Sequence, residues 1–102
     1  MEKKFYNAFP EIEIPAFLQD WEDDSWGNNV TASSRKDLPF GAALIVWVNS
    51  DKIEEREIWE GSKYIVVLED ESGDPIADEW ESNTEAEALK AIEHLTAVNE
   101  NR

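Results

Sequence analysis

The fold depends most on residues 42–48, which read Ala-Ala-Leu-Ile-Val-Trp-Val. Every side chain in this run is apolar, and such an uninterrupted run is typical of a β-strand that is covered on both faces. Residues 64–68 form a second run of β-type residues, and a dense group of turn-forming residues follows at 70–75. We therefore expect these two runs to be the central strands of a sheet.

Shorter strands are expected outside this pair. Residues 30–34 are β-branched or small, which predicts a short strand at an edge of the sheet, where polar side chains can stay in water. Residues 76–81 alternate, with Trp80 on one face and Glu79 and Glu81 on the other, so they predict a half-exposed strand.

The segment 50–61 is compatible with two elements. Ser50 and Asp51 could cap a short helix, whereas residues 57–60 precede a Gly-Ser pair and could form one arm of a hairpin. Of the two, we expect a strand near the end of the segment.

The N-terminal region is expected to cover part of the sheet. Residues 1–14 mix aromatic and aliphatic side chains with charges and a proline, which predicts an extended arm whose aromatic residues dock onto the domain. Pro15 suits the first turn of a helix, and apolar residues at near-helical spacing then predict a short helix that ends near Trp21.

The C-terminal region predicts a longer helix over residues 85–98. Thr84 and Glu87 have the spacing of a capping box, in which a hydroxyl and a carboxylate satisfy backbone N–H groups at the helix start. One apolar face is expected to pack on the sheet, and it consists of Ala88, Leu89, Ile92 and Leu95.

Together these elements predict a single α+β domain over residues 1–102. It contains an antiparallel sheet of about four strands, a C-terminal helix packed on one face and a short N-terminal helix. A single long helix would leave part of the sheet uncovered, and spare apolar and tryptophan surface would favour a homodimer or a bound ligand.

Net charge is the most extreme property of the sequence. The 102 residues include 24 Asp and Glu against 9 Lys and Arg, which gives a formal net charge of -15. Phosphate backbones and anionic lipid surfaces repel such a chain, so we expect neither direct nucleic-acid binding nor membrane binding. The element order is similar to that of double-stranded RNA-binding domains, but those present a basic helix N-terminus to phosphates, whereas residues 83–87 here are acidic. The charge instead favours solubility and steering toward basic partners or cationic ligands.

Nothing in the sequence indicates export or sulfur chemistry. The first residues carry two lysines without an apolar stretch behind them, and the longest apolar run, residues 40–48, is too short to span a bilayer. The chain has no cysteine, so it can form neither a disulfide nor a thiolate zinc site. We expect a cytoplasmic protein.

Catalysis is not expected. The only histidine, His94, lies two positions after Ile92, which turns it about 200° away from the apolar face of the predicted helix and toward solvent. The carboxylates are so numerous that adjacent pairs arise by chance. Residues from Asp70 to Glu81 partly match a calcium-loop register, but Pro75 stands in place of the required glycine, so a plain hairpin turn is expected. We expect no metal and no cofactor.

Tryptophans next to carboxylates supply the candidate binding residues. A tryptophan ring attracts cations and carboxylates add negative charge, so a pocket with both would suit an amine or a surface that carries lysine or arginine. The simpler interpretation is that these tryptophans fill the core, because among this many carboxylates an acidic neighbour is expected anyway. The candidate residues are Trp21, Asp23, Asp24, Trp26, Trp59, Glu79, Trp80 and Glu81.

The sequence supports three functional hypotheses. The first is a non-enzymatic interaction protein whose acidic surface engages a basic partner protein and could mimic nucleic acid. The second is a small-molecule binding domain for cationic amphipathic ligands, which uses the tryptophans and carboxylates. In the third, the negative charge serves solubility only. An enzyme that uses carboxylates alone ranks below these three, and it would need a carboxylate buried beside a cleft with a raised pKa. The charge places the interaction protein first.

Overall fold

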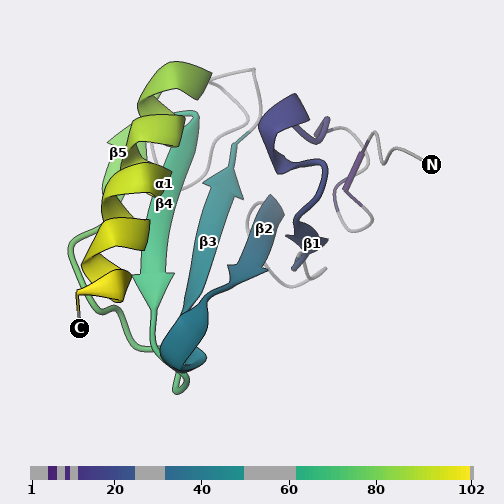
Figure 1. The fold of residues 1–102 in the computed structure, drawn as a ribbon. Coiled ribbons are helices and arrows are strands. Elements are labelled where there is room, and N and C mark those ends of the chain that lie inside the picture. Colours follow the sequence, from purple (N-terminus) through teal and green to yellow (C-terminus); the bar gives the residue numbers. More distant parts are fainter. Residues whose placement is uncertain (1–4, 7–8, 10–11, 25–31, 50–61, 102) are drawn as a thin grey trace.

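The computed structural model describes residues 5–6, 9, 12–24, 32–49 and 62–101. These residues contain one antiparallel sheet of five strands in the order β1-β2-β3-β4-β5, with a C-terminal helix packed against it (Figure 1). The elements are η1 (Ala16–Leu18), β1 (Glu22–Asp23), β2 (Ala32–Asp37), η2 (Pro39–Gly41), β3 (Ala43–Val48), β4 (Tyr64–Glu69), β5 (Trp80–Ser82) and α1 (Glu85–Glu100). The α+β class is as predicted, with one strand more than expected. The strand expected at 57–60 lies outside the described residues.

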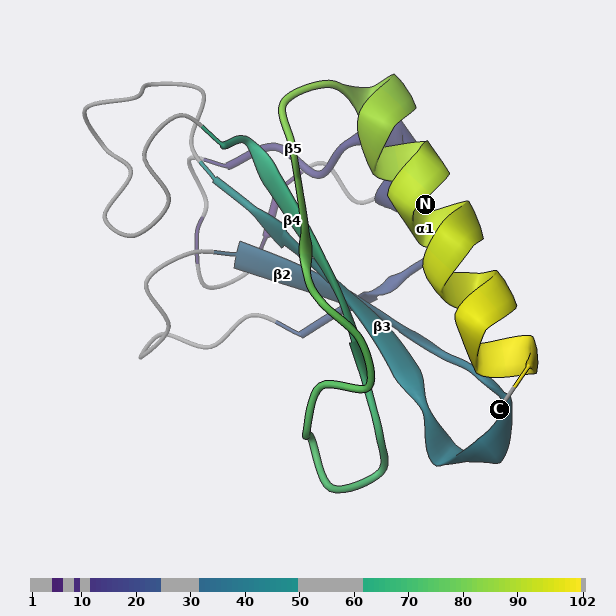
Figure 2. The same ribbon diagram turned by 90° about the vertical axis from the view of Figure 1, so that its left-hand side faces the viewer.

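β3 is the central strand, as its sequence predicts. It pairs with β2 on one side and with β4 on the other, and its side chains alternate between the two faces of the sheet. Leu44, Val46 and Val48 belong to the core that packs against α1, which lies across one face (Figure 2). Ala43 and Ile45 on the opposite face are buried as well. Both faces of β3 are therefore shielded from water, which explains why the strand lacks polar side chains.

β2 is an interior strand, whereas the sequence predicted an edge strand over residues 30–34. The two-residue strand β1 pairs along its outer side, so the described part of β2 lies between two neighbours. Ser33 and Ser34 are consequently buried rather than in water. The edge prediction was wrong because two adjacent charged residues carry no periodicity that could reveal β1.

The N-terminal segment folds back on itself and enters the core. Phe5 and Glu13 form an isolated antiparallel bridge, and the Tyr6 N–H donates to the Ile12 carbonyl at 3.2 Å. The described part of the predicted arm is thus not extended throughout. Tyr6, Ile12 and Ile14 do pack in the core, as expected for a docked arm.

The predicted N-terminal helix is a single 3-10 turn. η1 follows Pro15, whose carbonyl accepts a hydrogen bond from the Leu18 N–H at 2.9 Å. Leu18 is fully buried, so the turn places one anchor in the core. The prediction of a helix up to Trp21 was wrong, because the chain must extend to pair with β2 from Glu22 onward.

Tyr6 makes a buried hydrogen bond with β2. Its side chain is 1% exposed, and its hydroxyl lies 2.7 Å from the Ser34 hydroxyl. Burial raises the pKa of Tyr6 to about 12, and the hydrogen bond with Ser34 offsets part of that shift. The folded protein therefore disfavours deprotonated Tyr6.

Tyr6→Phe should lower the free energy of unfolding by about 1–2 kcal/mol at pH 7, because the Ser34 hydroxyl stays buried without this partner. Since the pKa of Tyr6 is raised from 10.0 to about 12 on folding, the wild-type protein should also lose stability as the pH rises through this interval, and the variant should lose less. Urea unfolding at pH 7 and at several pH values between 10.0 and about 12 measures these effects. The double variant Tyr6→Phe, Ser34→Ala is the control for the pair, and unchanged stability of Tyr6→Phe at pH 7 would contradict the buried bond.

α1 begins at the predicted capping box. The Glu87 N–H donates to Thr84 Oγ1 at 3.2 Å, and the Thr84 hydroxyl donates to Glu87 Oε1 at 3.1 Å. Leu89 was predicted to lie on the apolar face, but it is 44% exposed. The helix packs on β4 and β5, and Leu89 lies beside the stripe of buried residues. The buried residues of the helix are Ala88, Ala91, Leu95 and Asn99.

β5 begins later than predicted, at Trp80. The predicted turn after β4 is present, and Asp70 Oδ1 organises it by accepting backbone hydrogen bonds from Ser72 and Asp74, at 2.9 and 3.0 Å. Pro75 makes only an isolated bridge with β4. The Ile76 N–H still donates to the Leu68 carbonyl at 2.8 Å, so the ladder breaks after Ile76. Between the Glu69–Pro75 bridge and the Val66–Trp80 pair, β4 advances three residues and the other segment five, so two extra residues bulge out before the strand resumes at Trp80.

η2 connects β2 to β3 through a strained residue. Phe40 has φ 67° and ψ 25°, a left-handed conformation that bulky side chains rarely adopt, and it is 67% exposed. The turn is tied to α1, because the Asn99 side-chain amide donates to the Pro39 carbonyl at 3.0 Å. Gly41 follows with φ 75°, and a Cβ there would lie 3.1 Å from Glu71 Oε2. Glycine is therefore needed at position 41 but would also suit position 40.

Phe40→Gly should raise the free energy of unfolding by up to about 1 kcal/mol, because glycine adopts a positive φ without strain. Gly41→Ala should lower it by about 1–2 kcal/mol, since it adds both the positive-φ penalty and the close contact with Glu71. Urea unfolding of the two variants and the wild-type protein measures whether each substitution raises or lowers the free energy of unfolding. A loss of stability in Phe40→Gly would mean that the turn depends on the phenylalanine ring.

Candidate functional site

The structure separates the predicted binding residues into two groups. At or beside β1, the first strand of the sheet, lie Trp21, Asp23 and Asp24. At or beside β5, the last strand, lie Glu79, Trp80 and Glu81. Outside the described residues lie Trp26 and Trp59. The described candidates therefore do not form one site, because β2, β3 and β4 stand between them.

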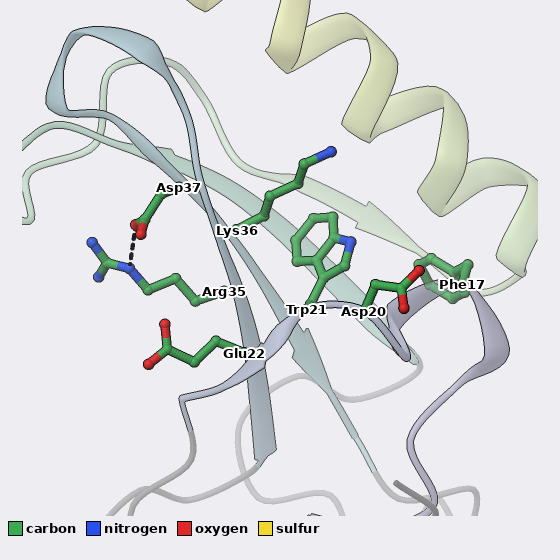
Figure 3. A pocket seen from close by; sticks show the side chains of 7 residues that line it. All are labelled: Phe17, Asp20, Trp21, Glu22, Arg35, Lys36 and Asp37. Carbon is green, nitrogen blue, oxygen red and sulfur yellow. Dashed lines mark hydrogen bonds and ion pairs between the residues drawn. The ribbon is translucent and has the colours of Figure 1, made fainter. Parts of the chain in front are cut away.

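Trp21 lines a hollow of about 360 Å³ beside β1 and β2 (Figure 3). A cation of the same chain is already next to its ring, because Lys36 Nζ lies 6.0 Å from the ring centroid. A cation from outside would therefore compete with this lysine for the ring. The lining residues are Phe17, Asp20, Trp21, Glu22, Arg35, Lys36 and Asp37.

Arg35 adds a second positive charge to this hollow. Its Nε–H donates to Asp37 Oδ1 at 3.1 Å, and this bond raises the pKa of Arg35. Lysine and arginine occur in the described part of the chain at positions 35, 36, 63 and 90, so two of them meet here. The carboxylates around Trp21 are thus partly neutralised by their own neighbours. No local pattern predicts this, because Arg35 lies opposite Glu22 only through the pairing of β1 with β2.

Glu69 of β4 lies within the field of the same arginine. Partial burial is the main cause that raises the pKa of Glu69; the charge of Arg35 opposes the shift, and Asp24 and Asp70 add to it. Charged Glu69 therefore costs the folded protein some stability. When the pH is below the pKa that Glu69 has in the unfolded chain, this loss of stability is absent. The loss reaches its full size once the pH exceeds the higher pKa that Glu69 has in the folded protein.

Glu69→Gln should be more stable than the wild-type protein at pH 7 by a few tenths of a kcal/mol, since the side chain is only partly buried. The difference should shrink as the pH falls below about 4, where wild-type Glu69 is protonated in both states. Urea unfolding from pH 3 to 7 measures this, and Glu93→Gln on the exposed side of α1 controls for the lower net charge. A less stable Glu69→Gln would show that attraction to Arg35 outweighs the cost of burial.

Trp80 lies at the opposite edge of the sheet with part of its ring open to solvent. It is 40% exposed, and its ring lies against His94 of α1, with centroids 4.8 Å apart and an angle of 38° between the planes. The helix periodicity predicts an exposed His94, which is confirmed, but not its contact with Trp80. An adjacent hollow of about 330 Å³ is lined by Trp80, Glu81, Ser82, Glu87 and Lys90.

Three exposed carboxylates lie near Trp80: Glu79 and Glu81 flank it in sequence on the opposite face of the strand, and Glu87 lines the hollow with it. Trp80, Glu79, Glu81 and Glu87 are together called the Trp80 surface. Two of them also have structural contacts: Glu81 Oε1 accepts a hydrogen bond from the Ser62 hydroxyl at 3.2 Å, and Glu87 caps α1. In the described part of the chain the lysines that lie over aromatic rings are those above Trp21 and Tyr64. The exposed side of Trp80 therefore stays accessible to a cation from outside.

Comparison with protein-family models, with curated proteins and with solved structures finds no match to this chain. Among the residues that the structure describes, no helix is long and apolar enough to cross a membrane. In the same ranges, no three or more histidine, aspartate and glutamate side chains are grouped so as to hold a metal ion. Function must therefore be inferred from the two edges of the sheet.

Proposed function

We propose that this protein is a non-enzymatic interaction protein that binds a basic segment of a partner protein through the Trp80 surface. The observation that carries the proposal is the 40% exposure of Trp80 among exposed carboxylates. Tryptophan rings attract lysine and arginine, and aromatic anchors are enriched at the centres of protein interfaces. Trp21 is a weaker candidate, because Lys36 already lies over its ring.

The net charge supports the same proposal. At a formal charge of -15, the chain attracts basic proteins over long distances and repels nucleic acid and acidic proteins. Carboxylates and phosphates attract the same side chains. The Trp80 surface would therefore compete with nucleic acid, as a mimic of it, wherever the basic segment of the partner is itself a nucleic-acid-binding site.

A cationic small molecule is the second candidate, and the hollow beside Trp80 favours it. Its volume of about 330 Å³ falls at the lower end of the range for ligand pockets, about 300–1,000 Å³. Lys90 also lines this hollow and would repel a compact amine. An extended basic segment reaches Glu79 and Glu81 as well, so it gains more attraction than a small amine does.

Calorimetric titration with a nine-residue oligolysine peptide tests the proposal, since four other tryptophans would complicate a fluorescence signal. Binding should weaken by about tenfold or more between 50 mM and 0.5 M NaCl, where the Debye length falls to about 4 Å. Trp80→Ala should weaken it by about tenfold at low salt, which corresponds to roughly 1.4 kcal/mol for the lost cation–π contact. Leu89→Ala, a similarly exposed apolar residue of α1, should leave binding unchanged.

Two other results would contradict the proposal. If benzyltrimethylammonium binds more tightly than the peptide, the hollow is a small-molecule site. If neither binds at low salt, the negative charge serves solubility only.

A further inference from the structure

The hydrogen-bond alternation of the sheet determines which backbone groups of β5 point outward. The Asn49 N–H donates to the Lys63 carbonyl at 2.8 Å, and these residues lie opposite each other, one step beyond the pair of Val48 and Tyr64. In an antiparallel sheet, bonded pairs alternate with non-bonded pairs. Tyr64 and Val66 therefore direct their backbone groups away from β3 and toward β5.

On β5 the residues opposite these two are Ser82 and Trp80. Glu81 lies between them, opposite Ile65 in a non-bonded pair, so its N–H and C=O point away from β4. β5 is the last strand of the sheet in the described residues, Glu81 is exposed, and the hollow beside Trp80 adjoins the strand. The outer edge of β5 thus offers one donor and one acceptor at Glu81.

We infer that the basic segment of the partner binds as an extra antiparallel strand along the outer edge of β5. This inference rests on the proposed function and specifies how the segment is held. The residue opposite Glu81 exchanges both backbone hydrogen bonds with it. The neighbours of that residue project toward α1, where the hollow is lined by Trp80 and Glu87 and also by Lys90, so the attraction there comes from Trp80 and Glu87. The segment is therefore extended, with lysine or arginine at alternate positions.

Charge determines which strand can be added. Edge strands that are short and charged resist pairing with another copy of the same chain, and β5 has three residues with Glu81 at its centre. The other edge, β1, consists of Glu22–Asp23, so pairing of two copies sets acidic edges against each other. Like charges on paired strands are destabilising, whereas a strand with its lysines directed toward α1 places them beside Glu87 and the ring of Trp80.

The test titrates the full chain with a nine-residue peptide of alternating lysine and valine with blocked ends. Two modified peptides are compared with it. One carries an N-methyl group on the backbone nitrogen of every valine and the other on the backbone nitrogen of every lysine. Each modification removes backbone donors but keeps the side chains and their charge. When lysines face α1, valine lies opposite Glu81, so valine methylation should weaken binding by about tenfold. Lysine methylation should leave it nearly unchanged.

Two variants of the protein test the same edge without modified peptides. Glu81→Pro lacks the N–H that points outward, and edge strands tolerate proline. This variant should bind the unmodified peptide more weakly than Glu81→Gln, which loses only the charge. Far-UV circular dichroism checks that Glu81→Pro is folded, and the peptide comparison does not depend on this variant.

The outcomes separate the inference from the proposed function. Equal binding of all three peptides would overturn strand addition and leave an acidic surface that binds basic segments by charge alone. Absence of binding by every peptide would overturn the proposed function and the strand addition together.

Discussion

The burial of β3 on both faces is the constraint on which the rest of the structure depends. A strand with no polar side chain must be covered on both sides, so it occupies the middle of the sheet with β2 and β4 as its neighbours. In the described part of the chain, β3 therefore carries no charge, and the charged residues of its neighbours lie toward one end of each strand, at Arg35–Asp37 in β2 and at Glu69 in β4. Where polar groups do enter the core, as for Tyr6 and Ser34, they bond to each other.

The two edges of the sheet are the strands on which the proposed binding depends. β1 and β5 are short and acidic, which discourages edge-to-edge association between copies. They differ in their aromatic residues: Trp21 is engaged by a lysine of its own chain, whereas Trp80 is partly open beside exposed carboxylates. Local charge compensation, more than composition, thus distinguishes the two edges and is the reason that the proposal places the partner at β5.

The elements with a strong pattern could be predicted from the sequence, and those decided by tertiary contacts could not. The apolar runs of β3 and β4 and the capping box of α1 specify their elements locally. β1 exists only because β2 offers it an edge, and two extra residues between Pro75 and Trp80 delay β5, which the alternation of 76–81 does not show. Likewise Trp80 and its carboxylates were recognisable as neighbours in sequence. The contact of Lys36 with Trp21 and the distance between the two tryptophans depend on strand order, which no local pattern encodes.

Native-state amide hydrogen exchange of the free protein tests the open edge most directly, because it reports on each backbone N–H of β5. The alternation requires that the amides of Trp80 and Ser82, which face β4, exchange slowly and that the amide of Glu81 between them exchanges much faster. Protection of Glu81 equal to that of its two neighbours would contradict the account, since the outer edge of β5 would then already be occupied.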